Sequence, residues 1–170
     1  MTLPKFLQKL FKLTQKIDKI VELAAYHESE HIALAYFYGY SCDSVELIIS
    51  DPGNAKTKLN YNGDLLLITS ITNCKTDSSF FNSLDKSLKA RSPQVADCHA
   101  TVLLAGSVAE ATILNDSKVD GNMEVEISFP DLEKVDNIHF FLSNIDKAHD
   151  PNYIKTKLMQ TLSLMKKKGD

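Results

Sequence analysis

Apolar residues recur every three or four positions through the first 40 residues of the chain. This spacing places them on one face of a helix, and five lysines up to residue 19 fall largely between them. Gly39 marks the end of this helix, because glycine readily adopts the left-handed conformation that follows a last helical turn. The pattern predicts a long helix over about 3–39, basic and amphipathic over 1–20, with a break between 14 and 18 as an alternative.

The pattern then changes to one typical of strands. Residues 44–50 are rich in β-branched side chains, residues 57–61 alternate between polar and apolar, and residues 65–71 are almost continuously apolar. The sequence DPGN at 51–54 favours a turn between the first two segments. These features predict a small antiparallel sheet, in which 65–71 is the most buried strand.

The segment over 72–92 is polar and rich in serine, with an apolar pair at Phe80 and Phe81. This composition predicts a long loop with a short helix, which could serve as a flap. Ser92 and Pro93 then have the residue types preferred at the N-cap and first position of a helix. We therefore expect a helix from Ser92 to about residue 114.

Two further helices are expected, one beginning at Pro130 and one over 151–168. The predicted fold class is thus mainly α (α+β), with the small antiparallel sheet following the first helix. A chain of 170 residues can bury a core of useful size, so we expect a single domain over 1–170.

Composition and charge argue against several classes of protein. The net charge of −3 gives no general attraction to nucleic acid, and no apolar run is long enough to span a bilayer. The N-terminus has no signal-peptide pattern, and three cysteines without a C-x-x-C pair favour free thiols in a reducing compartment. We expect a cytoplasmic protein.

The basic stretch over 1–20 can pack on the domain or lie on a membrane surface, and its apolar stripe favours packing.

The first helix contains the sequence His27-Glu28-Ser29-Glu30-His31. Histidines four positions apart lie on one face of a helix, so His27 and His31 can bind one metal ion together. Glu28 lies beside that face, where it can take a proton from water without being a ligand. Zinc lowers the pKa of bound water to about 7 and polarises a carbonyl, so this spacing indicates metal-assisted amide hydrolysis. The alternative is a helix whose polar residues pack against a neighbour.

A zinc site for hydrolysis needs a third protein ligand and an open position for water. The residues alone leave the third ligand open among the acidic and histidine side chains that follow: Glu110, Asp116, Asp120, Asp131, His99, His139 and His149. Glu110 and Asp131 stand out, because each is acidic and lies in a predicted helix.

Three segments resemble, in order, the peptidase domain of the FtsH-type membrane-bound ATP-dependent zinc metalloproteases. AYHESEHIALAYFYGY (25–40), with the strand VELIIS after it, is similar to that family's metal-binding helix and strand. HATVLLAGSVAEATILND (99–116) resembles a family helix rich in small residues. SFPDLEKVDNIHFFL (128–142) resembles the family helix whose aspartate is the third zinc ligand. Together these segments cover most of the chain from about 20 to 145.

The resemblance implies a role for each matching residue. His27, His31 and Asp131 match the zinc ligands, and Glu28 matches the catalytic base. Glu110 matches a family glutamate that we expect to orient a histidine ring rather than bind the ion, the alternative being an acid on the helix surface. The implied protein is a helical, zincin-like metalloendopeptidase: a zinc-dependent hydrolase that cleaves peptide bonds in polypeptides.

Two departures from the family change this expectation. Ser29 and Glu30 replace a small Ala-Gly pair, so Glu30 either points to solvent or adds charge near the site. The chain has no Gly-x-x-x-x-Gly-Lys-Ser/Thr phosphate loop and hence no AAA ATPase module. We therefore expect ATP-independent cleavage of unfolded or flexible substrates, with a homo-oligomer or a separate ATPase partner left open. The competing hypothesis is a catalytically inert, metal-stabilised binding or regulatory module.

Overall fold

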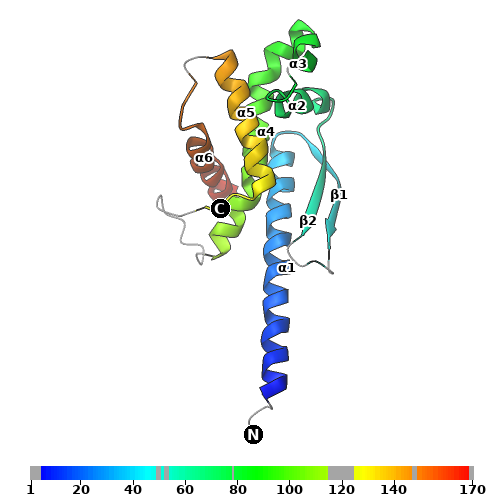
Figure 1. Cartoon of the computed structure of the whole chain (residues 1–170), viewed down its shortest axis with the longest axis vertical. Helices are drawn as coiled ribbons and strands as arrows, with labels where there is room; N and C mark the ends of the chain where they lie inside the picture. Colours follow the sequence, from blue (N-terminus) through cyan, green and yellow to red (C-terminus); the bar gives the residue numbers. More distant parts are fainter. Residues whose placement is uncertain are drawn as a thin grey trace.

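The computed structural model describes residues 5–48, 51, 54–77, 79–114, 125–146 and 149–168. Within these residues the chain is mainly helical, with one two-stranded antiparallel sheet, so the predicted fold class is confirmed. The elements in chain order are α1 (Lys5–Phe37), β1 (Ser41–Leu47), β2 (Ala55–Asn60), α2 (Leu65–Thr72), α3 (Ser79–Ser83), α4 (Lys86–Leu114), α5 (Phe129–Ile145) and α6 (Tyr153–Lys168) (Figure 1).

The first helix, α1, is continuous, so the alternative of a break between 14 and 18 is wrong. It ends as the sequence predicts, because Gly39 adopts a φ of +81° just after the last turn. The N–H of Tyr40 donates to the carbonyl of Ala35 at 2.9 Å, which satisfies a carbonyl that the helix leaves free. This turn sends the chain back along α1 as β1 (Figure 1).

The two strands form a hairpin that packs against α1 (Figure 1). Ser41 pairs with Asn60 and Leu47 with Ala55, with an irregularity between Cys42 and Ser44. In the part of the chain that the structure describes, β2 has β1 on one edge and no strand on the other. That open edge of β2 is available for a further extended chain.

Residues 65–71 form the helix α2 and not the predicted third strand. The side chains of Leu67, Ile68 and Ile71 are buried at helical spacing, while Leu65 and Leu66 are exposed. A short apolar run has no periodicity that separates a buried strand from a buried helix. Packing against α4 and α5 therefore decides its structure.

The helix α4 begins at Lys86, well before the predicted start at Ser92. Asp85 is the residue that caps it, since its Oδ1 accepts a hydrogen bond from the N–H of Leu88 at 2.9 Å. The segment over 72–92 consequently contains α3 and the first turns of α4 and is not one long loop.

Pro93 lies inside α4, where it has no N–H to donate to the carbonyl of Lys89. The hydroxyl of Ser92 donates to that carbonyl instead, at 2.7 Å. Ser92 is 1% exposed, so this bond satisfies an acceptor in a buried environment. The Ser-Pro pair is therefore an adaptation of a helix interior and not a helix start.

The core surrounds α4, which packs against α1, α2, α5 and α6 (Figure 1). Most of its small residues are buried, and they allow the other helices to approach closely. Leu104 of α4 and Val135 and Ile138 of α5 are completely buried between these helices. Within the described residues, no helix combines the length and the apolar character needed to cross a membrane.

Candidate metal centre

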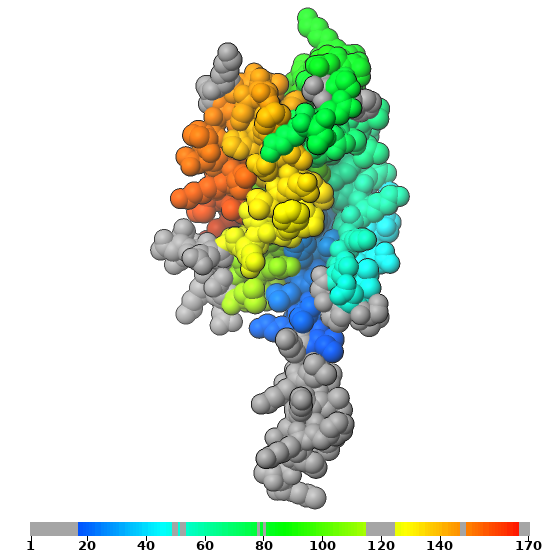
Figure 2. Space-filling model, viewed as in Figure 1, coloured from blue at the N-terminus to red at the C-terminus, as the bar shows by residue number. Residues whose placement is uncertain are grey.

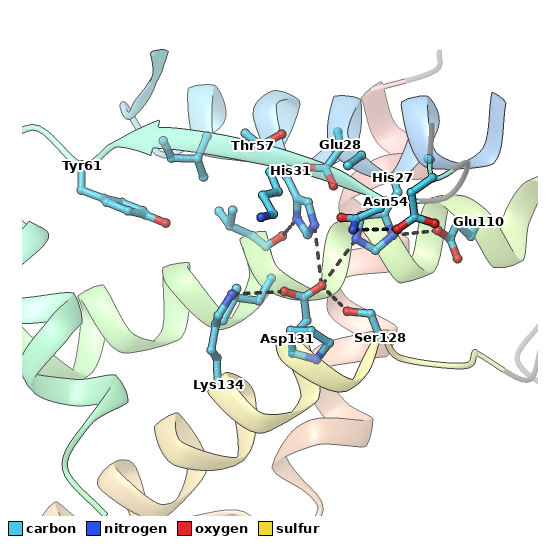
Figure 3. A pocket seen from close by; sticks show the side chains of 18 residues that line it. His27, Glu28, His31, Asn54, Thr57, Tyr61, Glu110, Ser128, Asp131 and Lys134 are labelled. Atoms are coloured by element: carbon cyan, nitrogen blue, oxygen red, sulfur yellow. Dashed lines mark hydrogen bonds and ion pairs between the residues drawn. The ribbon is translucent and has the colours of Figure 1, made fainter. Parts of the chain in front are cut away.

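The structure brings His27 and His31 of α1 together with Asp131 of α5. One potential ligand atom from each residue lies within 4.8 Å of the others. His27 Nε2 is 3.4 Å and His31 Nε2 is 3.8 Å from Asp131 Oδ2, and these side chains are only 10–12% exposed (Figure 3). Two residues from one helix and one from a helix far along the chain thus point at a common space, in the combination that the family resemblance implies.

The ring of His27 is fixed by two residues of α4. Its Nδ1 lies 2.9 Å from Glu110 Oε1, so an N–H there donates to the carboxylate and leaves Nε2 facing Asp131. The ring also lies on the backbone at Gly106, where an added methyl carbon would be 2.5 Å from His27 Nε2. Glu110 therefore contacts the histidine on the side away from the common space, where it can orient the ring.

His31 is held in the same way by the backbone of α4. Its Nδ1 lies 2.6 Å from the carbonyl oxygen of Val102, which can only accept a hydrogen bond. The proton therefore sits on Nδ1, and Nε2 is the nitrogen that faces Asp131. Both histidines thus direct Nε2 at one point, as zinc ligands do.

Asp131 lies in the first turn of α5, after Ser128 and Pro130. The hydroxyl of Ser128 donates to Asp131 Oδ2 at 2.6 Å, and Lys134 Nζ lies 3.7 Å from Oδ1. The N–H of Ser128 donates to the Ser107 hydroxyl at 3.2 Å, which ties the start of α5 to α4. These contacts set the position of the carboxylate.

Charge is distributed unequally over the three side chains in the metal-free site. Burial lowers the pKa of His27, but hydrogen bonds to Asp131 and Glu110 outweigh it and raise that pKa to about 9. Burial alone would raise the pKa of Asp131, yet the hydrogen bonds from His27 and Ser128 lower it to about 2. Burial and the nearby His27 lower the pKa of His31. A cation bound between these side chains would therefore replace one proton, the one on His27 Nε2.

Glu28 lines the same cavity as the three side chains, and it is 7% exposed. The cavity has a volume of about 880 Å³ and is bounded by α1, β2, α4 and α5. Figure 2 shows atoms of α1 (blue) between α5 (yellow) and the sheet (cyan) on this face. No hydrogen bond from the described residues occupies the Glu28 carboxylate.

The other histidines and the motif's unusual residues take no part in the site. His99 is 4% exposed, contacts the ring of Tyr61, and has a pKa lowered to about 3 by burial. His139 and His149 contact each other and Tyr153, away from α1. The exposed Ser29 donates to the Ala25 carbonyl, and Glu30 does not line the cavity. Asp116 and Asp120, and the side chains over 1–16, lie outside the described residues.

Sequence reasoning missed several residues that shape the site. Gly106 is one of several small residues in its helix, and the sequence does not single it out as the surface on which the His27 ring lies. Ser128 had a signal of its own, because a serine two residues before Pro130 suits a helix start. Lys134 and the Val102 carbonyl carry no signal in a single sequence, since only the packing of α4 and α5 brings them to the site.

Comparisons of the chain with protein-family models, with curated proteins and with solved structures gave no match. The resemblance to the FtsH-type peptidases therefore stays a prediction, and the function has to be inferred from the site itself.

Proposed function

We propose that the protein is a zinc metallopeptidase that hydrolyses peptide bonds in unfolded or flexible polypeptides. One observation carries the proposal: the ligand atoms of His27, His31 and Asp131 converge within 4.8 Å in a cavity that Glu28 also lines. Two imidazoles and one carboxylate form a ligand set used by catalytic zinc sites, in which a fourth position stays open for water. The residues present thus fit Zn²⁺, and they are the residues that the FtsH-type resemblance implies.

Each residue has a definite task in this proposal. Zn²⁺ held by His27, His31 and Asp131 would lower the pKa of water to about 7 and polarise the peptide carbonyl. Glu28 takes the proton from the attacking water and then donates it to the leaving amine nitrogen. Glu110 keeps the His27 proton on Nδ1 and so leaves Nε2 free to bind.

The open edge of β2 supports a polypeptide as the substrate. The residues Asn54–Thr57 and Leu59 line the cavity, so this strand runs along the candidate metal centre. The N–H of Ile48 bonds to the carbonyl of Asn54 at 3.0 Å, and antiparallel pairing alternates from there. The N–H and C=O of Thr57 are then directed away from β1, where an extended peptide can pair with them.

A Glu28→Gln variant tests the proposal. We expect the wild-type, zinc-loaded protein to cleave unfolded casein and the variant to lose at least 100-fold in rate, because the base is gone. Metal analysis should show equal zinc in both proteins, since Glu28 is not among the ligands. Equal cleavage by both proteins would contradict the role of Glu28. No cleavage by either, with zinc bound, would favour the inert binding or regulatory module.

Oligomeric state, an ATPase partner and a cytoplasmic location stay predictions.

A further inference from the structure

We propose that the end of the cavity between Asp131 and Tyr61 binds a carboxylate of the substrate and that Lys134 selects it. The inference rests on the proposed function and adds a substrate class to it. The preferred peptides carry an acidic side chain, or their own C-terminal carboxylate, next to the bond that is cleaved.

The two ends of the cavity differ in charge. Figure 3 shows Glu110 and Asn54 at the end beside His27, and Asp51 lies 3.2 Å from the Asn54 amide. Tyr61 and Lys134 lie at the opposite end, beyond His31 and Asp131 (Figure 3). One end thus has carboxylates, and the other has an ammonium group and a hydroxyl.

Lys134 has unused hydrogen-bonding capacity at this end. Its Nζ lies 3.7 Å from Asp131 Oδ1, which is an ion-pair distance and longer than a hydrogen bond. Among the described residues, no acceptor takes any of the three N–H groups of its ammonium. Zinc bound by Asp131 would offset that carboxylate's charge, so the Lys134 ammonium would then favour another anion.

Tyr61 supplies a second donor, held in place by its neighbours. Its ring contacts Tyr40 and His99 edge to face, with centroids 5.2 Å and 5.3 Å away, and the hydroxyl points into the cavity (Figure 3). Burial raises the pKa of Tyr61 to about 12, so the hydroxyl keeps its proton at neutral pH. No acceptor among the described residues takes that proton.

Donors that face a cavity without a protein acceptor favour a ligand that accepts hydrogen bonds. A carboxylate satisfies an ammonium and a hydroxyl together and gains charge-assisted hydrogen bonds, whereas an apolar side chain would leave both unpaired. The chemistry of this end therefore matches an acidic substrate group.

Peptide binding to the zinc-loaded Glu28→Gln protein tests the inference without requiring cleavage. The probes are fluorescent peptides that differ only in Glu, Gln or Lys beside one central bond, each made with a C-terminal acid and a C-terminal amide. We expect the Glu peptide to bind about 10-fold more tightly than the Gln peptide in fluorescence anisotropy. If the preference follows the C-terminal acid instead, the bound group is the chain end and the enzyme removes C-terminal residues.

Variants of Lys134 assign the preference. Lys134→Gln should abolish the difference between the Glu and Gln peptides, and Lys134→Arg should retain it because the charge stays. Lys155→Gln, which removes an exposed charge from α6, is the matched control and should have no effect. Zinc content is measured for each, because Lys134 contacts Asp131. Equal binding of all peptides, or a preference that survives Lys134→Gln, would overturn the inference.

Digestion of the same peptides by the wild-type protein separates this inference from the proposed function. Cleavage beside the acidic residue supports both. A preference for Glu in binding, without cleavage by the zinc-loaded wild type, supports the carboxylate site and overturns the peptidase. Cleavage that ignores the acidic residue, with equal binding of the Glu and Gln peptides, supports the peptidase and overturns the carboxylate site.

Discussion

Gly106 serves the candidate metal centre through the side chain that it lacks. Its backbone conformation is helical, so the position does not require glycine for the chain to fold. What it requires is space, because the His27 ring lies where a Cβ atom would be. The position of the His27 ring thus depends on the absence of a side chain at Gly106.

The variant Gly106→Ala should therefore lower zinc affinity by at least about 10-fold, because His27 has to move away from α4 and from Glu110. Alanine is the better helix former by about 1 kcal/mol, so loss of helix would not explain the effect. Competition against a chromophoric chelator gives the affinity, and circular dichroism gives the helix content. An unchanged zinc affinity would show that His27 can bind from another position.

At the residue scale, the candidate ligands could be predicted from sequence to the extent that helical spacing determines them. His27, Glu28 and His31 occupy one short stretch of one helix, so their relation is local. The choice of Asp131 over Glu110 needed the family resemblance, because residues on different helices meet only through packing. The same reason explains why Lys134 and the Val102 carbonyl could not be predicted.

At the scale of elements, the start of α4 tolerates an internal proline because Ser92 takes over a missing hydrogen bond. Ser92→Ala should lower the free energy of unfolding by about 1–2 kcal/mol, since the Lys89 carbonyl would lose its donor. The double variant Ser92→Ala/Pro93→Ala regains an N–H at residue 93 and should recover much of the loss. Urea unfolding measures both.

Wild type, the two single variants and the double variant form a double-mutant cycle that tests whether Ser92 acts through the Lys89 carbonyl. A coupling of at least about 0.5 kcal/mol between the two positions is expected, because both act on the same carbonyl. Strictly additive effects would mean that the Ser92 hydroxyl contributes by some route other than the bond to Lys89.

The strand β2 gives a second prediction at this scale. Thr57→Pro removes an N–H that is directed away from β1, so the hairpin should persist while pairing with an extended substrate is lost. We expect kcat/KM for an unfolded substrate to fall about 10-fold or more, with unchanged zinc content. Thr57→Val, which keeps the N–H, is the control and should stay near wild type. Equal activity of both variants would place the substrate elsewhere in the cavity.

The elements that sequence reasoning misassigned share a physical cause. Residues 65–71 and the Ser92-Pro93 pair both have local patterns typical of another structure. In both cases a contact outside the expected pattern decides: α4 and α5 bury one side of α2, and within α4 the Ser92 hydroxyl supplies the hydrogen bond that Pro93 lacks. The long amphipathic helix α1 was predicted correctly, because periodicity over many residues outweighs single exceptions.

At the scale of the whole molecule, the site joins α1, α4 and α5, so its charge state affects the stability of the fold. The folded-state pKa of His27 is raised from 6.5 to about 9, so its stabilising contribution is complete below pH 6.5 and disappears towards pH 9. The pKa of Asp131 is lowered from 3.8 to about 2, so its contribution is present above pH 3.8 and disappears towards pH 2. The metal-free protein gains most from this pair between pH 3.8 and 6.5.

Zinc bound as proposed would reverse the pH dependence of stability on the alkaline side, because it would bind only after His27 has lost its proton. The difference in Tm between zinc-loaded and chelator-treated protein should therefore grow as the pH rises from 6.5 to 9, while the Tm of the chelator-treated protein falls. Differential scanning fluorimetry at fixed zinc excess measures both curves. In His27→Asn the growth of the Tm difference and the fall in Tm of the chelator-treated protein should both vanish, since the imidazole that carries the proton and binds zinc is gone. A Tm difference that stays constant across this range would mean that His27 is not the group whose proton zinc replaces.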